Sequence, residues 1–360
     1  ISYNFILLAK WGFVAFFDLF MSLLLLTRYT RFLINPFLSK ANKETLRLII
    51  ESDACFVKGG GFIHSVGRLT DSYTVYFQLF HLLLAQSFGK PIYIMPNSFG
   101  PFYGLAVIWL LRKTFRKCKL ITVRESISCM KLNEIGLTSK IYPDLGFFLE
   151  KNFFLSEDII KIYNLYPERK LVGITVRPYR FPEEEDPMGK YNNYLQGILD
   201  FSKWIYRNGF LPVFIEHTLS ETSHESDKNA ILSIISKLEK NQYYYISDEK
   251  YSCRDLKSVY SKMDYVVGTR FHSVIFSLSE NVPSIAITYG GNKGQGIMKD
   301  LGLEKYAIAI SEFNEHKAIK MFKKLVANQK KVTTMLKRKN IYIKENYFNL
   351  INEIRESKSN

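Results

Sequence analysis

The sequence contains little cysteine, and its cysteines follow no recognised pattern. The four residues lie at positions 55, 118, 129 and 253, with no C-x-x-C pair and no metal-ligand spacing. This usage is typical of reduced, partly buried thiols in a cytosolic protein and argues against a disulfide framework. We therefore expect no metal ion and no other cofactor.

The sequence also lacks an apolar run long enough to cross a membrane. Residues 5–26 are strongly apolar, but Lys10 and Asp18 interrupt them, and the longest uncharged stretch is residues 19–27. A spanning helix needs about 20 apolar residues, and a charge at its centre costs about 2.5–3.5 kcal/mol. We expect instead a buried or membrane-surface helix, in a cytoplasmic protein that is peripheral at the inner face of the plasma membrane. No signal-peptide cleavage site follows. The sequence does not begin with methionine, and we expect that residues precede Ile1.

Nucleotide and nucleic-acid signatures are missing as well. There is neither a G-x-G-x-x-G fingerprint nor a P-loop, so the sequence does not predict NAD or ATP binding. Acidic residues are outnumbered, 34 against 49 Lys and Arg, which gives a formal net charge of +15. That charge suits anionic lipids and anionic small substrates. No basic stripe with interleaved aromatics is present, so nucleic acid is not an expected partner.

What is present is an alternation of strand-length apolar runs with helical patterns. One set occupies residues 54–57, 91–95 and 120–123, and a second occupies residues 171–176, 211–215, 243–246, 265–267 and 284–287. This order is the βαβ signature of parallel sheets, and the length suggests two domains. We predict an α/β fold with Rossmann-like domains at 1–155 and 165–312. Two C-terminal helices in residues 313–360 are expected to pack back on the first domain.

The clearest candidate site follows the apolar run at residues 265–267. Gly268 ends that run, and Arg270 and His272 come next, at the start of a helical pattern. Ligands of open α/β sheets bind at the carboxyl ends of the strands. A fixed cation and an imidazole at a helix N-terminus suit an anionic substrate that needs a proton moved. His64 ranks second among the histidines, and His81, His217, His224 and His316 show no convergent partner.

Three further candidate segments follow strands of the first set. Gly60 and Gly61 lie in a glycine run that lets backbone amides approach a ligand, or that makes only a tight turn. A polar loop contains Asn97 and Ser98, which line a cleft or form a rigid connection. The pair Arg124 and Glu125 belongs to a site or forms a mutual salt bridge.

Three more candidates belong to later segments. Asp144 either accepts a sugar hydroxyl or caps a helix. Arg177 leaves a predicted central strand and faces the site, or pairs with the acidic loop at residues 183–186. That loop is expected to be solvated and not to bind a cation. Lys293, in a glycine-rich loop, holds an anion or is merely solvated.

Together these motifs resemble the polysaccharide pyruvyl transferase family. The resemblance is carried, in chain order, by Gly59-Gly60-Gly61-Phe62, Asn97-Ser98-Phe99-Gly100-Pro101-Phe102, Val123-Arg124-Glu125-Ser126-Ile127-Ser128, Tyr142-Pro143-Asp144 and Val266-Val267-Gly268-Thr269-Arg270-Phe271-His272. It continues through residues 281–289, Lys293 and residues 301–303. The family's glycine- and asparagine-rich opening segment is not visible near residue 1.

The resemblance implies two Rossmann-like domains facing across a cleft, in a GT-B-like arrangement. It implies transfer of pyruvate from phosphoenolpyruvate to two hydroxyls of a sugar, giving a cyclic ketal, in bacterial capsular or exopolysaccharide biosynthesis. Arg270 and His272 would belong to the donor site, joined by Arg177 and Lys293. His272 would be the general acid. The residues expected to contact the sugar acceptor or to line the cleft are Gly60, Gly61, His64, Asn97, Ser98, Arg124, Glu125 and Asp144. The basic composition and the apolar N-terminal segment lead us to expect a lipid-linked acceptor at an anionic membrane surface.

Two other functions remain open from the sequence. The first is a GT-B-type glycosyltransferase that uses a nucleotide sugar, with Glu216 or Asp144 binding the ribose or acting as base. The second is a non-catalytic component of a polysaccharide assembly complex at the membrane surface. The intact Arg270 and His272 favour an enzyme over this last alternative.

Overall fold

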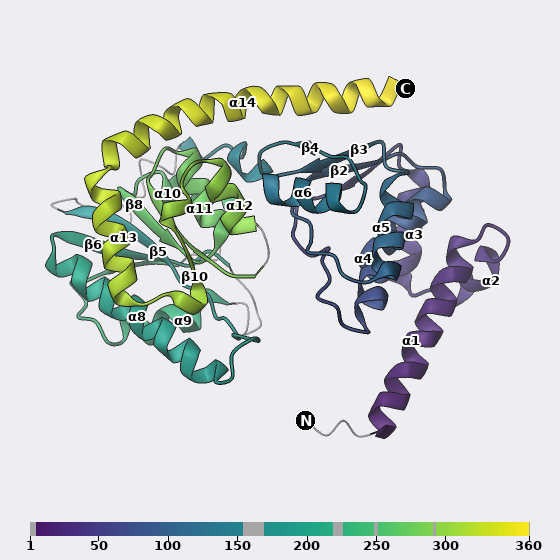
Figure 1. The fold of residues 1–360 in the computed structure, drawn as a ribbon, viewed down its shortest axis with the longest axis horizontal. Coiled ribbons are helices and arrows are strands. Elements are labelled where there is room, and N and C mark those ends of the chain that lie inside the picture. Colours follow the sequence, from purple (N-terminus) through teal and green to yellow (C-terminus); the bar gives the residue numbers. More distant parts are fainter. Residues whose placement is uncertain (1–4, 154–168, 219–225, 248–250, 291–292, 360) are drawn as a thin grey trace. The chain divides into compact units, whose positions relative to one another are not determined.

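The computed structural model describes residues 5–153, 169–218, 226–247, 251–290 and 293–359. The chain forms two compact units, Ile1–Tyr142 with Leu350–Asn360 (unit 1) and Pro143–Asn349 (unit 2). Each unit contains one parallel sheet and its own helices, which confirms the predicted α/β class (Figure 1). The predicted domain join and His224 fall in part or whole outside the described residues, so the boundaries at 155 and 165 stay a prediction.

Unit 1 contains a four-stranded parallel sheet in the order β1-β2-β3-β4. Its strands are β1 (Cys55–Val57), β2 (Ile92–Asn97), β3 (Leu120–Val123) and β4 (Lys140–Ile141). Its helices are α1 (Phe5–Leu26), α2 (Arg31–Ile34), α3 (Lys40–Glu51), α4 (Asp71–Ser87), α5 (Leu105–Phe115) and α6 (Ser126–Glu134), with the 3-10 turn η1 (Asn35–Phe37). Side chains of α4, α5 and β2, among them Leu79, Leu111 and Ile94, form a fully buried core.

Unit 2 contains a six-stranded parallel sheet in the order β10-β9-β8-β5-β6-β7. Its strands are β5 (Lys170–Thr175), β6 (Phe210–Ile215), β7 (Tyr244–Ile246), β8 (Tyr265–Gly268), β9 (Ser284–Thr288) and β10 (Ala307–Ala309). Its helices are α8 (Pro187–Arg207), α9 (Asp227–Ile235), α10 (Cys253–Tyr260), α11 (Phe271–Ser279), α12 (Lys293–Asp300), α13 (Glu315–Ala327) and most of α14 (Gln329–Ser359), with 3-10 turns η2 (Leu145–Phe147), η3 (Glu304–Tyr306) and η4 (Ile310–Glu312). Every residue of β8 and β9 is buried, which explains their continuous apolar sequences.

The end of α14 groups with unit 1. Glu353 there pairs with Lys140 and accepts a hydrogen bond from the hydroxyl of Tyr142 (3.1 Å). The two predicted C-terminal helices are thus present as α13 and α14, and polar contacts attach the last turns of α14 to β4 and the residue after it.

The strand order of unit 2 reverses between β5 and β8. From β5 the chain builds outward through β6 and β7, and then returns to the other side of β5 to form β8, β9 and β10. In open α/β sheets such a reversal opens a crevice at the carboxyl ends of the two strands, and ligands bind there. The fold therefore places the residues after β5 and β8 at a ligand-binding position.

Gly268 allows α11 to begin directly against the end of β8. A Cβ atom at this position would lie 2.6 Å from Ser273 Oγ and 2.7 Å from Val274 Cγ2, both on the first turn of the helix. Only a residue without a side chain permits this approach. The tight turn makes Arg270 the N-cap residue of α11 and puts His272 in its first turn.

Helix α1 packs against α4 along one side. Its Ser22 Oγ is hydrogen-bonded to Tyr76 Oη (2.9 Å), and Leu25 is buried. None of the helices, as far as the structure describes them, combines the length and the apolar character that crossing a bilayer requires.

Candidate active site

Polar residues follow four strands at the carboxyl edge of the unit 2 sheet, near the strand reversal. Arg177 follows β5, His217 follows its neighbour β6, and Arg270 and His272 follow β8. Lys293 begins α12, after β9. Parallel strands bring their carboxyl ends to one edge of the sheet, so this edge gathers five cationic or titratable residues from distant parts of the sequence.

Arg270 is held by a buried carboxylate, that of Asp227. The Nε and Nη2 atoms of Arg270 both lie 2.8 Å from Asp227 Oδ1. The other carboxylate oxygen accepts hydrogen bonds from the backbone N–H groups of His217 (3.2 Å) and Thr218 (3.0 Å). Burial raises the pKa of Asp227 to about 6, and the charge of Arg270 opposes that rise. The ion pair fixes the direction of the guanidinium and compensates part of its charge.

His272 lies between a carboxylate and an ammonium group. Its Nε2 atom is 3.3 Å from Lys293 Nζ and 4.0 Å from Asp144 Oδ1, and 49% of its side chain is exposed. Asp144 is buried and also caps η2, because its Oδ1 accepts the backbone N–H of Gly146 (2.9 Å). Three predicted site residues are thus brought together around the Nε2 atom of the imidazole.

Arg177 rests on an aromatic ring. Its guanidinium carbon lies 3.9 Å from the centre of the Tyr289 ring and 5.6 Å from that of Tyr179, and its Nε donates to the carbonyl of Pro178 (3.2 Å). Stacking of this kind orients a guanidinium and leaves its edge available for bidentate hydrogen bonds. The structure therefore places Arg177 at the same sheet edge, one strand away from β8.

The acidic loop at residues 183–186 has contacts of its own. Glu184 pairs with Lys190 (3.6 Å), and Asp186 caps α8 by accepting the N–H of Gly189 (2.9 Å). Two of its four acidic residues thus serve α8. Over the described ranges, no group of three or more His, Cys, Asp or Glu side chains is arranged to hold a metal ion. The expectation of no metal and no cofactor stays a prediction.

His217 is the site residue that sequence reasoning missed. Its Nδ1 atom lies 3.0 Å from the hydroxyl of buried Tyr260. Burial lowers the pKa of His217 to about 3, helped by the positive charges of His272, Arg270 and Lys293, so its ring is neutral at pH 7. One signal was available, because His217 follows the run at residues 211–215 as Arg177 follows the run at 171–176.

The two histidines line one pocket of about 470 Å³. Its other walls are mostly apolar and are formed by Leu145, Gly146, Leu149, Tyr251, Cys253, Leu256 and Phe276. All of these residues belong to unit 2. A pocket with titratable groups at one side and apolar walls elsewhere is the usual form of a small-molecule site.

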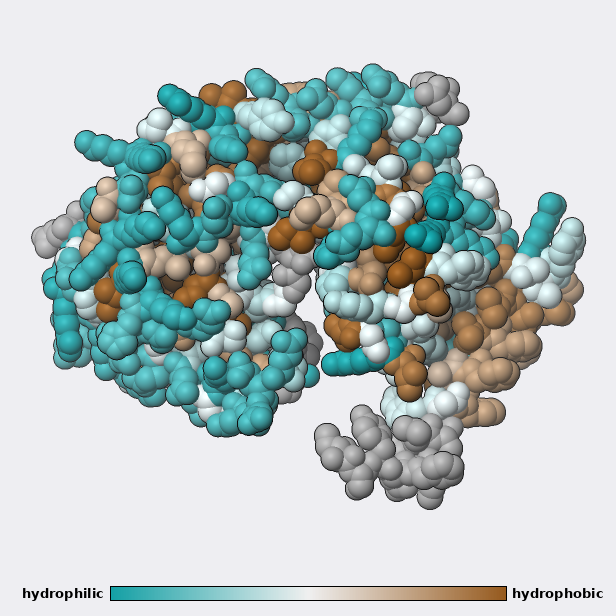
Figure 2. All heavy atoms as spheres, viewed as in Figure 1, coloured by the Kyte–Doolittle hydropathy of each residue, from teal (hydrophilic) through white to brown (hydrophobic). Residues whose placement is uncertain are grey.

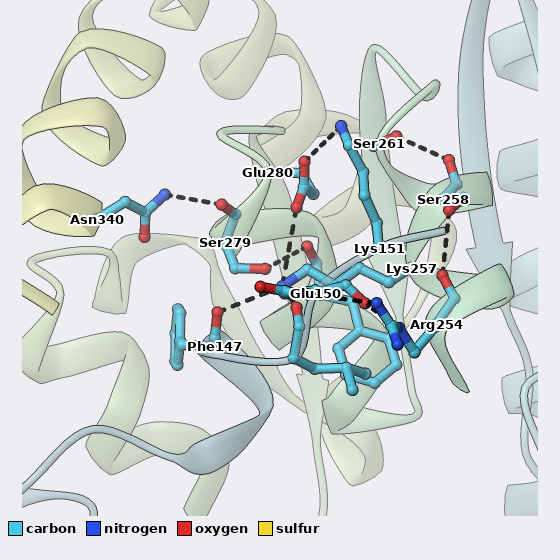
Figure 3. Close-up of polar contacts among 12 residues, drawn as sticks. Phe147, Glu150, Lys151, Arg254, Lys257, Ser258, Ser261, Ser279, Glu280 and Asn340 are labelled. Atoms are coloured by element: carbon cyan, nitrogen blue, oxygen red, sulfur yellow. Dashed lines mark hydrogen bonds and ion pairs between the residues drawn. The ribbon is translucent and has the colours of Figure 1, made fainter. Parts of the chain in front are cut away.

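Lys257 anchors the segment at residues 147–151 (Figure 3). Its Nζ donates to the carbonyl oxygens of Phe147 (3.3 Å) and Leu149 (2.6 Å) and lies 3.8 Å from Glu280 Oε1. Lys151 pairs with the other oxygen of Glu280 (2.8 Å). Burial lowers the pKa of Lys257 to about 8. The clamp ties residues 147–151 to α10 and to the residue that follows α11.

The unit 1 candidates form a hydrogen-bonded cluster at the ends of β1, β2 and β3. Asn97 Oδ1 accepts the N–H groups of Gly60 (2.7 Å) and Ser98 (2.9 Å). Arg124 donates from Nε to Ser98 Oγ (2.7 Å) and from Nη2 to the carbonyl of Gly60. Asn97 and Arg124 are buried, and their hydrogen bonds to Gly60 hold the glycine loop in one conformation.

The remaining unit 1 candidates differ in exposure. Glu125 is fully buried and caps α6 by accepting the N–H of Ser128 (2.7 Å), and burial raises its pKa. Gly61 and His64 are exposed. Within this cluster the residues open to a ligand are therefore those of the glycine loop and His64.

Solved structures share this fold at low sequence identity. The UDP-GlcNAc 2-epimerase from Neisseria meningitidis, bound to UDP-GlcNAc, aligns with a TM-score of 0.51 and 14% identity over 87% of this chain and 81% of that one. HepE from Anabaena, in complex with UDP and glucose, aligns with a TM-score of 0.52 and 10% identity over 88% and 80%. These likenesses confirm the predicted Rossmann-like, GT-B-like fold.

Sequence comparison identifies the family. The amylovoran biosynthesis protein AmsJ of Erwinia amylovora is 26% identical over 241 residues, which are 64% of this chain and 56% of AmsJ. The chain thus spans little more than half the length of that relative. The sequence model of the family described as polysaccharide pyruvyl transferase matches residues 7–291 of this chain. The chain therefore belongs to the polysaccharide pyruvyl transferase family.

Proposed function

We propose that this protein transfers pyruvate from phosphoenolpyruvate to two hydroxyls of a sugar and so forms a cyclic ketal during exopolysaccharide or capsule biosynthesis. Family membership supports a polysaccharide-modifying transferase. The observation that carries the finer proposal is the meeting of Arg270, His272 and Lys293 at the strand reversal of unit 2.

The cationic residues at the carboxyl edge of the unit 2 sheet bind the donor in different ways. Phosphoenolpyruvate carries a phosphate of roughly −1.5 to −2 charge and a carboxylate. Asp227 compensates part of the charge of Arg270, so Arg270 contributes mainly directed hydrogen bonds. Lys293 and the stacked Arg177 supply net positive charge. This division lets the site bind a polyanion without a group of uncompensated buried cations.

Ketal formation proceeds by a proton transfer and two additions. The protonated His272 gives its Nε2 proton to the methylene carbon, which becomes a methyl group, and C2 takes oxocarbenium character. A sugar hydroxyl attacks C2 and loses its proton to the imidazole. The C2–O bond to phosphate then breaks. The second hydroxyl closes the ring and its proton leaves with the phosphate, so the products are the pyruvate ketal and inorganic phosphate.

The acceptor is proposed to be a lipid-linked sugar that reaches the glycine loop and His64 of unit 1. Gly61 and His64 are exposed there, while Asn97 and Arg124 hold the loop from behind. A lipid-linked acceptor also fits a protein that works at the anionic inner face of a membrane, as the basic composition suggests.

The experiment is to incubate the protein with phosphoenolpyruvate and a panel of lipid-linked sugars. We expect one acceptor to gain a pyruvate ketal by mass spectrometry, with release of an equal amount of phosphate. The H272A variant should lose turnover and keep its affinity for phosphoenolpyruvate. Wild-type turnover by H272A would contradict the acid role of His272.

A nucleotide-sugar glycosyltransferase is the competing function, and the structure weakens one of its two candidate residues, Glu216 and Asp144. Glu216 is buried and accepts hydrogen bonds from the hydroxyls of Tyr245 (2.9 Å) and Ser247. Thermal stabilisation separates the two functions. Phosphoenolpyruvate should raise the melting temperature and UDP should not, whereas the reverse result would favour the glycosyltransferase.

A further inference from the structure

We infer that α1, α2 and η1 form a surface that docks on an anionic lipid bilayer. The inference deepens the membrane location suggested under the proposed function, but it rests on a different part of the molecule. Vesicle binding tests it without any substrate, so its outcome is separate from that of the transferase proposal.

Over residues 10–26, the part whose side chains the structure describes, helix α1 has two apolar sides, and only one of them packs on the protein. The side facing α4 contains Ser22 and the buried Leu25. The other side carries a run of exposed residues at helical spacing, namely Phe13 (72% exposed), Phe16 (67%), Phe17 (51%), Phe20 (49%) and Leu23 (48%). Positions i, i+3, i+4 and i+7 share one face of a helix. Four phenylalanines thus form a continuous outward stripe.

The following elements extend the same surface. Helix α2 packs against α1, and the hydroxyl of Thr30 bonds to the carbonyl of Leu24 (2.6 Å). Large side chains of this segment are again exposed, namely Tyr29, Phe32, Leu33 and Phe37. In the space-filling view the hydrophobic colour gathers over α1 and α2 (Figure 2). Large contiguous apolar patches of this kind mark interaction surfaces.

The charges around this patch fit an anionic partner. Residues 10–43 include a single acidic residue, Asp18, whose carboxylate accepts a hydrogen bond from Tyr73 of α4 (3.2 Å). The same stretch has five basic residues, namely Lys10, Arg28, Arg31, Lys40 and Lys43. Arg31 bonds to the carbonyl of Leu25 (2.9 Å) and to Ser87 (2.8 Å), so the cations we assign to a lipid surface are the other four. Basic residues beside exposed aromatic side chains are the composition of helices that lie in the headgroup region of anionic membranes.

A bilayer suits this surface better than a second copy of the chain. A twofold contact would place the same patch on both partners and so bring the basic residues of one copy toward those of the other. A spanning role does not fit either, because no described helix is apolar enough over its length. We expect α1 to lie in the plane of the membrane surface. In that position the phenylalanine stripe enters the apolar layer, and the basic side chains stay at the level of the lipid phosphates.

The test is co-sedimentation with phosphatidylcholine vesicles and with vesicles that also contain phosphatidylglycerol. We expect binding to the anionic vesicles at low salt that weakens as salt is added, and little binding to the neutral vesicles. The variant F16S/F17S should bind the anionic vesicles at least about tenfold more weakly. A K10E/R28E variant should lose the preference for anionic lipid.

A matched control comes from α5 of the same unit. Leu105 and Trp109 are also large and exposed, and L105S/W109S should bind vesicles like the wild type. Unchanged circular dichroism would show that both serine variants fold. Three results would overturn the inference: no binding to anionic vesicles, equal losses in both serine variants, or a wild-type dimer that F16S/F17S converts to a monomer without any vesicle binding.

Discussion

Arg270 and His272 stand two residues apart in the sequence, yet their surroundings differ. Arg270 is bonded to the buried Asp227, whereas His272 is half exposed beside Lys293 and Asp144. The sequence could predict His272 and its helix start from local pattern alone. It could not predict Asp227, which lies 43 positions before Arg270 and shows no motif of its own.

The Arg270–Asp227 pair predicts that stability and donor binding can be separated. R270A leaves a buried carboxylate without its cation, which should lower the free energy of unfolding by about 3–5 kcal/mol. The double variant R270A/D227N removes both charges and should recover most of that loss. Calorimetry should nevertheless show phosphoenolpyruvate binding lost in both. Near-wild-type affinity in the folded double variant would exclude Arg270 from the donor site.

His217 predicts a pH dependence of stability. Its pKa is about 3 in the folded protein, below the ordinary 6.5, so below pH 6.5 the unfolded chain takes up a proton that the folded protein does not. Wild-type stability should therefore fall as pH falls from about 6.5 toward 3. Between pH 6 and 5, urea denaturation should show the wild type losing roughly 1 kcal/mol more than H217Q. The opposite effect of Asp227, whose pKa is raised, is present in both proteins and cancels. Equal losses would place His217 in a more solvated environment.

At the scale of elements, apolar runs predicted the buried strands well. The expected runs at residues 265–267 and 284–287 became β8 and β9 with little change in their bounds. The strands β4 and β10 were not predicted. Both are short and lie at the edges of their sheets, but β1 and β7 are three-residue edge strands as well, and the runs at residues 54–57 and 243–246 predicted them. Length and edge position alone therefore do not decide which strands the sequence reveals.

Gly268 predicts that the turn from β8 into α11 controls both stability and the site. In G268A the new methyl group would overlap Ser273 and Val274, so α11 must move away from the strand. We expect a loss of about 1–3 kcal/mol together with weaker phosphoenolpyruvate binding, because Arg270 and His272 move with the helix. As a control, G12A meets nothing within 4 Å and should leave binding unchanged. Wild-type affinity in G268A would separate the turn from the donor site.

At the scale of the whole molecule, the residues proposed to bind the donor and the glycine-loop residues belong to different units with different cores. The alternation of runs predicted two parallel sheets, and a resemblance in motif order predicted the family. The sequence did not distinguish, within each unit, the residues open to a ligand from those that only hold the structure together. Arg124 and Glu125 illustrate this, since both were candidates for a site and the structure shows them hydrogen-bonded within unit 1.

This division predicts where the donor should slow amide exchange. Phosphoenolpyruvate should protect the ends of β5 and β8 and the first turn of α11 in unit 2, while the sheet of unit 1 is unchanged. Hydrogen–deuterium exchange read by mass spectrometry checks this. H272A should keep the protection, and R270A/D227N should lose it. Protection confined to the glycine loop of unit 1 would show that phosphoenolpyruvate binds unit 1, and would contradict a donor site in unit 2.

The pocket beside His272 has a built-in attachment point for a reporter group. Cys253 lies in its wall and is exposed, whereas the other three cysteines are half-buried. A small thiol-reactive fluorophore should therefore react first at Cys253, and its emission would respond to the polarity of the pocket. Ligand entry could then be followed in real time, in wild type and in inactive variants alike, before the natural acceptor is known.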